Sequence, residues 1–236
     1  MKKTSSYFVS RLNIGRAVLA VFAIFGLLGS SALYVYASGT SSFSQTINAG
    51  TLATDIRSDA TTSVSSPAVA MSSKTFSFSC LSGGSASTGT FGTATERIYV
   101  DNPDGADNGW TLTLAPSATT ALWTQGGNTF DFNDAGGSGC TDGGDTDTKG
   151  GQMTVDPSVG SITTDYSGSD TTGISLGSST AYVEGTTNSV TLVTAGSTSA
   201  DVWRGYFKDI SLSQTIPAEQ AAAAYSLSFV LTATAS

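Results

Sequence analysis

Hydrophobic and polar residues alternate with a period of two in short stretches along most of this chain, and turn-forming residues separate the stretches. In the clearest example, at 225–234, one side of the chain would carry Tyr225, Leu227, Phe229 and Leu231. Alternation of this kind is typical of a β-strand that has one face in a core. By the same reasoning we expect strands at 46–56, 68–79, 98–100, 110–115, 152–155, 189–193 and 209–214.

Glycine, asparagine, aspartate and serine cluster between these stretches, as they do in turns. Two longer segments, 81–89 and 131–151, are so rich in these residues that we expect loops there. After residue 37, only 218–224 has a helix-compatible composition, and it is short. Many short strands with frequent turns predict an all-β fold, an antiparallel β-sandwich of Greek-key, Ig-like or jelly-roll-like type.

The first 37 residues follow a different pattern, which is typical of an export leader that forms a hydrophobic helix. An apolar run at 17–28 follows four basic residues, Lys2, Lys3, Arg11 and Arg16. Small or apolar residues at Val35 and Ala37 favour cleavage after Ala37. The alternative is an uncleaved membrane anchor, because 17–37 carries no charge and about 20 such residues span a bilayer. In both cases the rest of the chain is expected outside the cell.

The predicted organisation is therefore a signal peptide or anchor at 1–37, an N-terminal strand or arm at 38–66, and a β-sandwich at 67–236. All 18 acidic residues follow the leader, and only six of the ten basic residues do, so residues 38–236 carry a net charge of −12. Such a balance argues against nucleic acid as a partner, because phosphate binding requires a basic face. A membrane is expected to be contacted only through the N-terminal segment.

The two cysteines and the absence of histidine limit the chemistry of the chain. In an exported protein, Cys80 and Cys140 are expected to form a disulfide, although two free thiols are the alternative. Without histidine, Ser-His-Asp and Cys-His triads and the usual zinc sites are excluded. The acidic residues would allow a carboxylate pair for glycoside hydrolysis, but no local motif marks one. The sequence therefore predicts that the protein is not an enzyme.

Acidic residues in the loop at 131–151 form a candidate calcium site. Carboxylates at close spacing among glycine turns are the hard oxygen ligands that calcium prefers. The spacing differs from an EF-hand, and a solvated Asp/Gly loop is the alternative. The expected ligands are Asp131, Asp134, Asp142, Asp145 and Asp147.

Two motifs in order resemble the WxL-domain family of exported bacterial surface proteins. The first is Asn108-Gly109-Trp110-Thr111-Leu112, and the second runs from Ile216-Pro217-Ala218 to Phe229-Val230-Leu231, with Phe229 where the family has a second tryptophan. The resemblance covers about 76–236 and implies an all-β fold that associates non-covalently with peptidoglycan. It also implies a binding face made by Trp110, Leu112, Phe229 and Leu231. Packing of Trp110 in the core is the alternative.

The segment directly after the leader, Ser42-Phe43-Ser44-Gln45-Thr46-Ile47-Asn48-Ala49-Gly50-Thr51-Leu52, resembles the start of camelysin/TasA-type exported proteins. That resemblance implies subunits of extracellular fibres, some of which donate an N-terminal strand to a neighbour. Strand addition is physically reasonable for an arm that precedes a sandwich, since exposed sheet edges accept strands. An ordinary first strand of the same domain is the alternative.

Taken together, the sequence predicts a non-catalytic, exported bacterial cell-surface protein that associates with the envelope through a WxL-like β-sandwich. Its expected partners are cell-wall glycan or peptidoglycan, or other surface proteins. The alternative is a structural subunit of an extracellular filament or surface coat that self-assembles by β-strand exchange. A secreted glycan-acting enzyme is a third reading, which the sequence supports least.

Overall fold

The computed structural model describes residues 42–105, 108–143, 147–199 and 202–236, so the leader and its expected cleavage site lie outside the described residues. The chain divides into two units, Met1–Thr46 and Ile47–Ser236. Within the described ranges we find no α-helix, and no helical segment there is long and apolar enough to cross a membrane. The strands are β1 (Ala53–Arg57), β2 (Ser87–Phe91), β3 (Arg97–Asn102), β4 (Trp110–Pro116), β5 (Trp123–Gln125), β6 (Asn128–Phe130), β7 (Met153–Asp156), β8 (Ser161–Thr164), β9 (Ile174–Leu176), β10 (Thr180–Ala181), β11 (Val190–Ala195), β12 (Trp203–Lys208), β13 (Ile210–Gln214) and β14 (Phe229–Ala235).

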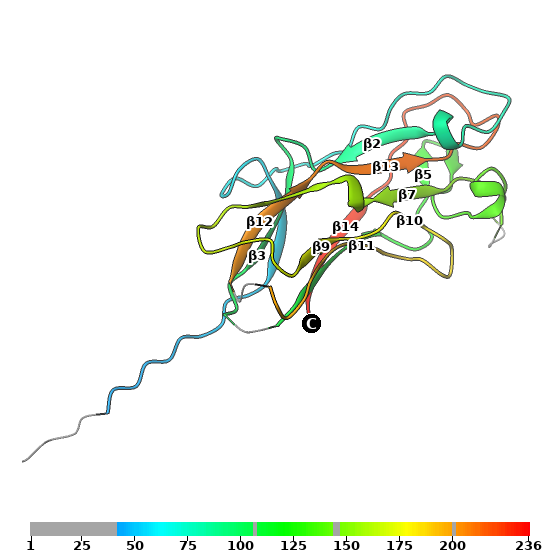
Figure 1. Ribbon diagram of the computed structural model, residues 1–236. Coiled ribbons are helices and arrows are strands. Elements are labelled where there is room, and N and C mark those ends of the chain that lie inside the picture. Colours follow the sequence, from blue (N-terminus) through cyan, green and yellow to red (C-terminus); the bar gives the residue numbers. More distant parts are fainter. Residues whose placement is uncertain (1–41, 106–107, 144–146, 200–201) are drawn as a thin grey trace, which may run out of the picture. The chain divides into compact units, whose positions relative to one another are not determined.

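One layer of the second unit consists of two antiparallel sheets, β1-β3-β12-β8 and β10-β7-β13-β2, whose strands follow one another in line across a bend (Figure 1). β12 and β13 form its centre, flanked by β3 and β2 on one side and by β8 and β7 on the other. Asp209, between β12 and β13, has φ of 64°, and its N–H donates to the carbonyl of Gly92 at 2.7 Å. Gly92 has φ of 77°, and a Cβ there would lie 2.7 Å from the Cα of Lys208, so the bend requires glycine.

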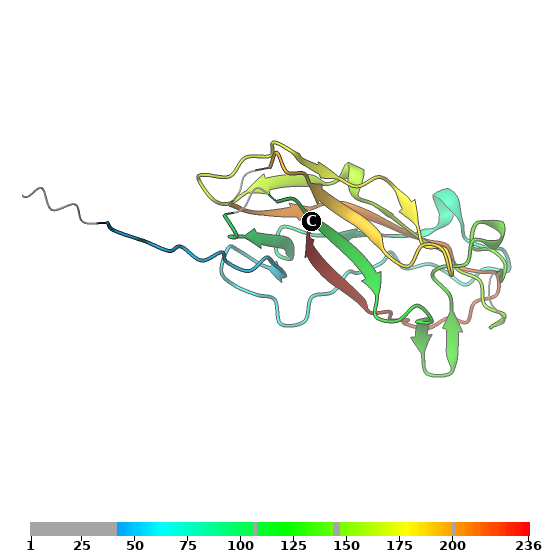
Figure 2. The ribbon, with the colours of Figure 1, turned by 90° about the horizontal axis from the view of Figure 1, so that it is seen from below.

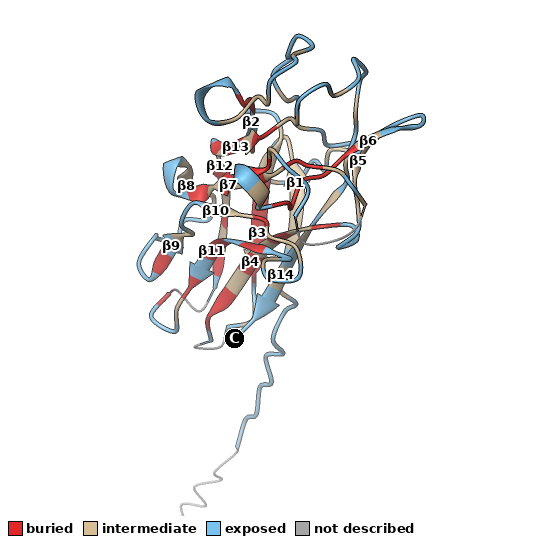
Figure 3. Ribbon diagram, turned by 90° about the vertical axis from the view of Figure 1, so that its right-hand side faces the viewer, coloured by how far each residue is buried: buried red, intermediate tan, exposed pale blue. Residues whose placement is uncertain are grey.

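The second layer is the antiparallel sheet β14-β4-β11-β9 (Figure 2). Along β4, buried residues alternate with more exposed ones, and in β11 the alternation is interrupted at Leu192 and Val193, where the ladder with β4 is irregular (Figure 3). β14 forms the edge of this sheet, and none of its residues is fully buried. The all-β, antiparallel fold predicted from the alternation is confirmed.

Aromatic rings from the two layers meet in the core. Trp110 of β4 lies 5.4 Å from Trp203 and 6.2 Å from Phe207 of β12, measured between ring centroids. All three side chains are buried, together with Ile98, Val100, Leu112, Val155, Leu192 and Ile210. This cluster holds the two layers together, because each buried aromatic side chain removes a large apolar area from water.

The predicted disulfide is confirmed: Cys80 and Cys140 are bonded, with their Cα atoms 5.6 Å apart. Cys80 ends an extended segment, residues 67–79, which we call the strap. The strap crosses one flank of the second unit beside β2, and its N–H at Ser72 donates to the carbonyl of Thr88 at 2.7 Å. The disulfide therefore fixes one end of the strap to the loop at 131–151, which we call the acidic loop.

Several expected elements differ from the structure. The strand expected at 68–79 is wrong, because the strap forms no ladder. The strand expected at 46–56 is confined to β1, and part of the loop expected at 81–89 is β2. The helix-compatible stretch 218–224 forms turns and bends. The sequence patterns also missed β5, β6, β8, β9, β10 and β12.

Candidate functional site

The four residues of the expected WxL-like binding face occupy two neighbouring strands, β4 and β14. Trp110 and Leu112 are fully buried, whereas Phe229 and Leu231 are partly exposed at the sheet edge. The antiparallel register places Trp110 opposite Ala235 and Phe229 opposite Pro116, so the two aromatic residues lie at opposite ends of the strand pair. The structure therefore places Trp110 and Leu112 in the core and leaves only the β14 residues near solvent.

A groove runs along the flank of the second unit, between the edge of one layer and the edge of the other. This flank groove has a volume of about 620 Å³ and is bordered by β1, the strap and β14. Side chains from β14 and the strap line it, and Leu114, Met153 and Leu212 lie at its floor. Its lining is predominantly apolar, from Ile56, Val69, Met71, Leu227, Phe229 and Leu231.

The strands that border the flank groove are sheet edges. Among the described residues, β14 forms its ladder with β4 alone, and β1 forms its ladder with β3 alone. β1 lies beside β14, but no ladder joins the two strands. Edge strands present backbone N–H and C=O groups that accept an added strand. The groove thus combines an apolar lining with backbone groups suited to β-pairing.

The segment 42–52, which we call the arm, is extended and highly accessible. Every residue from 42 to 50 is exposed, and the Phe43 and Ile47 side chains are 96% and 89% exposed. In the second unit, the arm is held by a hydrogen bond of 2.9 Å from the N–H of Gly50 to the carbonyl of Pro103. Phe43 and Ile47 are four residues apart, so both side chains would lie on one face of a strand.

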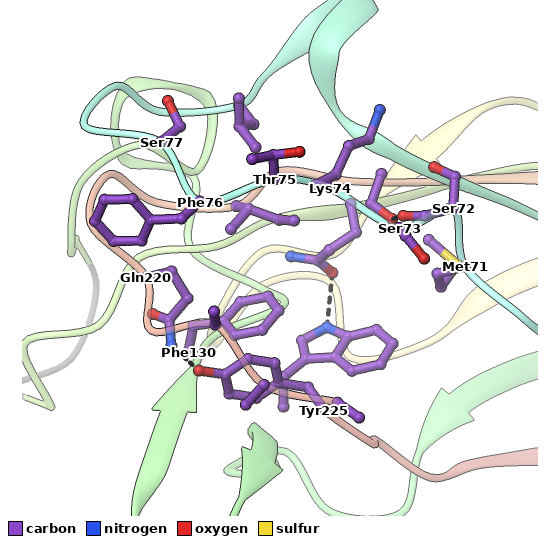
Figure 4. Close-up of a pocket in the computed structure, with 18 of the residues that line it drawn as sticks. Met71, Ser72, Ser73, Lys74, Thr75, Phe76, Ser77, Phe130, Gln220 and Tyr225 are labelled. Atoms are coloured by element: carbon purple, nitrogen blue, oxygen red, sulfur yellow. Dashed lines mark hydrogen bonds between the residues drawn. The ribbon is translucent and has the colours of Figure 1, made fainter.

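A second hollow, the aromatic pocket, lies between the strap and the segment before β14 (Figure 4). Its volume is about 550 Å³, and it shares Val69, Met71, Trp123 and Tyr225 with the flank groove. Trp123 and Phe130 come from the hairpin β5–β6, where they are stacked with ring centroids 5.8 Å apart. Tyr225 packs edge-to-face on Phe130 at 4.9 Å.

Hydrogen bonds fix the orientation of these rings. The indole N–H of Trp123 donates to Oε1 of Gln214 at 2.9 Å, and Nε2 of Gln214 donates to two backbone carbonyls, so this buried amide is fully engaged. The hydroxyl of Tyr225 accepts from Nε2 of Gln220 at 2.6 Å and donates to the carbonyl of Ala221 at 2.8 Å. Both aromatic walls are therefore preorganised.

The acidic loop brings part of the expected calcium site into the interior. Asp131 and Asp134 are buried, Asp142 is exposed, and Asp145 lies outside the described residues. Burial raises the pKa of Asp131 to about 7. The N–H groups of Phe132 and Asn133 donate to its carboxylate and lower the pKa, but burial has the larger effect. The carboxylates of Asp134 and Asp147 also raise this pKa.

Among the described residues, no three acidic or cysteine side chains are grouped closely enough to hold a metal ion. Asp134 Oδ1 accepts from the N–H of Gly143 at 3.2 Å, and Asp147 Oδ1 accepts from the N–H of Lys149 at 2.8 Å. Because Asp145 is not described, the full expected ligand set is not seen together. Calcium binding by this loop stays a prediction.

No family model, curated protein or solved structure matches the chain. The resemblances to WxL-domain and camelysin/TasA-type proteins therefore rest on the motifs themselves. The sequence patterns singled out Phe229, Leu231 and the arm, but they missed Trp123, Phe130 and the strap residues Val69 and Met71. The local signal was alternation for Val69 and Met71 and apolar character for Trp123 and Phe130, and neither signal shows that these residues meet.

Proposed function

We propose that this chain is a non-catalytic subunit of an extracellular filament or surface coat, in which the arm of one copy adds as a β-strand to the flank groove of the next. The observation that carries the proposal is the presence of two complementary features in one chain. The arm has exposed apolar side chains and no charged residue, and the flank groove has an apolar lining beside edge strands. Each feature leaves apolar surface in water that strand addition would cover.

The dimensions of the two features agree. At roughly 3.3 Å per residue, residues 42–49, which precede the anchored Gly50, would extend over about 26 Å and the seven-residue β14 over about 23 Å. The free part of the arm is therefore long enough to follow the whole of β14. Phe43 and Ile47 would then face the groove lining, while Ser44, Thr46 and Asn48 would face solvent.

Charge also favours this pairing. The chain from 38 onward carries a strong negative net charge, so two copies repel one another at low ionic strength. A donor segment without carboxylates approaches such a surface more easily than most of the chain does. Asp55 and Glu96 are the acidic residues that line the groove, and Asp55 is engaged by Arg57, whose Nε lies 3.2 Å from its Oδ2.

The arrangement of strands supports a jelly-roll-like assignment for the fold. In one layer the order is β2/β3, β12/β13, β7/β8, β10, and in the other it is β4, β11, β9, with β14 added at the edge. Two interlocked sheets of this order are typical of jelly rolls. On this assignment, β14 and β1 are additions at the same flank, which is where the groove lies.

The structure supports wall association through the WxL-like motif less well than it supports strand exchange. Trp110 and Leu112 would have to leave the core to contact a ligand, and their burial makes that costly. Export remains part of the proposal, and the Cys80–Cys140 disulfide supports it because such bonds persist in oxidising compartments.

The experiment that tests the proposal compares two double variants of the chain as cells release it. Phe43→Asp with Ile47→Asp places charges on the face expected in the groove. Ser44→Asp with Asn48→Asp adds the same charge to the opposite face. We expect multi-angle light scattering and negative-stain microscopy to show large assemblies for the wild type and the second variant, and monomers for the first. Equal assembly by both variants would contradict the proposal.

A further inference from the structure

The aromatic pocket has a chemistry of its own, which does not depend on strand exchange. It is bordered by the strap on one side and by Phe130 and Tyr225 on the other (Figure 4). Its volume of about 550 Å³ falls within the range of roughly 300–1,000 Å³ that is usual for small-ligand sites. The question is which class of ligand its lining would recognise.

The charge of the lining argues against two classes of ligand. In a chain with 18 acidic residues, no carboxylate lines this pocket among the described residues, so a small hydrated cation finds no ion-pair partner there. Lys74 is the basic residue in the lining, and Figure 4 shows its ammonium group turned away from the aromatic rings. A strongly anionic ligand would therefore find little compensation inside the pocket.

The remaining chemistry is aromatic faces surrounded by uncharged hydrogen-bonding groups. Trp123 and Tyr225 are partly exposed and line the pocket, together with the buried ring of Phe130, which packs against both. Around them lie the amide of Gln220 and the hydroxyl groups of the strap residues Ser72, Ser73, Thr75 and Ser77. This combination suits a ligand that is apolar on one face and rich in hydroxyl groups at its edge.

A neutral sugar ring has this combination. The C–H bonds on one face of a pyranose are polarised by the ring's oxygens, so they are attracted to the negative face of an aromatic ring. The equatorial hydroxyl groups can then pair with amide and hydroxyl groups at the rim. Because the aromatic walls are already held by Gln214 and Gln220, little side-chain entropy would be lost on binding. We infer that the aromatic pocket binds one or two neutral hexose or N-acetylhexosamine units of an extracellular glycan.

The tryptophans of the chain give a direct readout. Trp110 and Trp203 are 0% and 1% exposed, so a saturable fluorescence change on adding a ligand reports on Trp123. The probes are cellobiose and N,N′-diacetylchitobiose, with sorbitol as a polyol that lacks a ring. We expect one of the disaccharides to give a saturable change and sorbitol to give none.

Matched variants locate the site. Tyr225→Ala should weaken binding about tenfold, since it removes one aromatic wall. Gln220→Ala, on an accessible loop, is a second variant that should weaken binding without touching the core. Tyr166→Ala should leave binding unchanged, because Tyr166 is 46% exposed and lies outside the pocket lining.

Three results would overturn the inference. The first is no saturable change with either disaccharide at about 10 mM, ten times the concentration that half-fills a 1 mM site. The second is unaltered binding by both Tyr225→Ala and Gln220→Ala. The third is a response to a synthetic peptide of residues 42–52 and to neither sugar, which would assign the pocket to the arm. Failure of the light-scattering test of strand exchange would leave the sugar titration unaffected, so the two proposals fail separately.

Discussion

Cys80 is bonded to Cys140, and this disulfide joins the end of the strap to the acidic loop across 60 residues of sequence. The two segments otherwise have little regular structure to hold them. The strap in turn places Val69 and Met71 against the core and borders both hollows of the flank. The disulfide therefore anchors the C-terminal end of the strap, while the hydrogen bond from Ser72 to Thr88 and the packing of Val69 and Met71 hold its middle.

Removal of the disulfide should lower the stability of the protein substantially. On the chain-entropy account, a closed loop of 60 residues contributes about 4 kcal/mol. We expect Cys80→Ala with Cys140→Ala to lower the denaturant midpoint, and reduction of the wild type to have a similar effect. Denaturant unfolding with and without reductant measures this. Equal midpoints for the oxidised and reduced wild type would contradict the structural role of the bond.

Asp131 should make the stability depend on pH. Burial raises the pKa of its carboxyl to about 7, whereas an aspartate in the unfolded chain has a pKa of about 3.9. Between these values the folded protein binds more protons than the unfolded chain, so the free energy of unfolding decreases as pH rises. The contribution of Asp131 is present in full below about pH 4 and is lost as pH rises through about 7.

The variant Asp131→Asn tests this dependence, because its amide oxygen can still accept from the N–H of Phe132. We expect a flatter profile of unfolding free energy between pH 5 and pH 8, and a more stable protein at pH 8. Urea unfolding in a chelating buffer measures both. If the unfolding free energy changes with pH equally in the wild type and the variant, titration of the buried Asp131 does not cause the pH dependence.

Calcium should oppose the repulsion among the carboxylates of the acidic loop. We propose that calcium raises the melting temperature at pH 7.5, since the ion would offset the repulsion that Asp134 and Asp147 exert on the carboxylate of Asp131. Asp145→Asn with Asp147→Asn should abolish the increase, and Asp59→Asn, in an exposed turn, should not. Scanning calorimetry with calcium and then with chelator measures the effect. An unchanged melting temperature in the wild type would refute calcium binding.

Substitution of Trp110 separates a core role from a binding role. Trp110 packs against Trp203 and Phe207, and it is fully buried. We expect Trp110→Ala to reduce the unfolding free energy by about 3–5 kcal/mol, as other large-to-small core substitutions do. Chemical denaturation gives this value, and binding to purified cell-wall sacculi is measured in parallel. If the variant has normal stability but no longer binds sacculi, Trp110 belongs to a binding face and the core role is contradicted.

Local patterns predicted the strands whose alternation is complete in the sequence. The stretches at 110–115 and 225–234 alternate cleanly, and they contain most of β4 and β14. β12 was missed because Gly205 occupies one of its buried positions, where the alternation calls for a hydrophobic side chain. Glycine is required there, since a Cβ would lie 2.7 Å from the indole ring of Trp203. That close approach is a tertiary contact and has no signature in the sequence.

The strap shows the limit of the same reasoning. Its pattern predicted a strand, and Val69 and Met71 do face the core. However, alternation indicates burial of one face and does not indicate a hydrogen-bonding partner. The aromatic pocket could not be predicted from the sequence for a related reason. Trp123, Phe130 and Tyr225 come from a hairpin and from a distant segment, and only the fold brings their rings together.

Amide hydrogen exchange of the assembled protein tests strand exchange most directly. In a monomer residues 43–49 of the arm are exposed, and their amide hydrogens should exchange at the rate of an unstructured peptide. In the assembly, pairing with an edge strand should slow exchange across residues 43–49 and along the free edge of β14. The Phe43→Asp/Ile47→Asp variant serves as the unassembled reference. Fast exchange throughout the arm in a purified assembly, with β14 also unchanged, would contradict strand exchange.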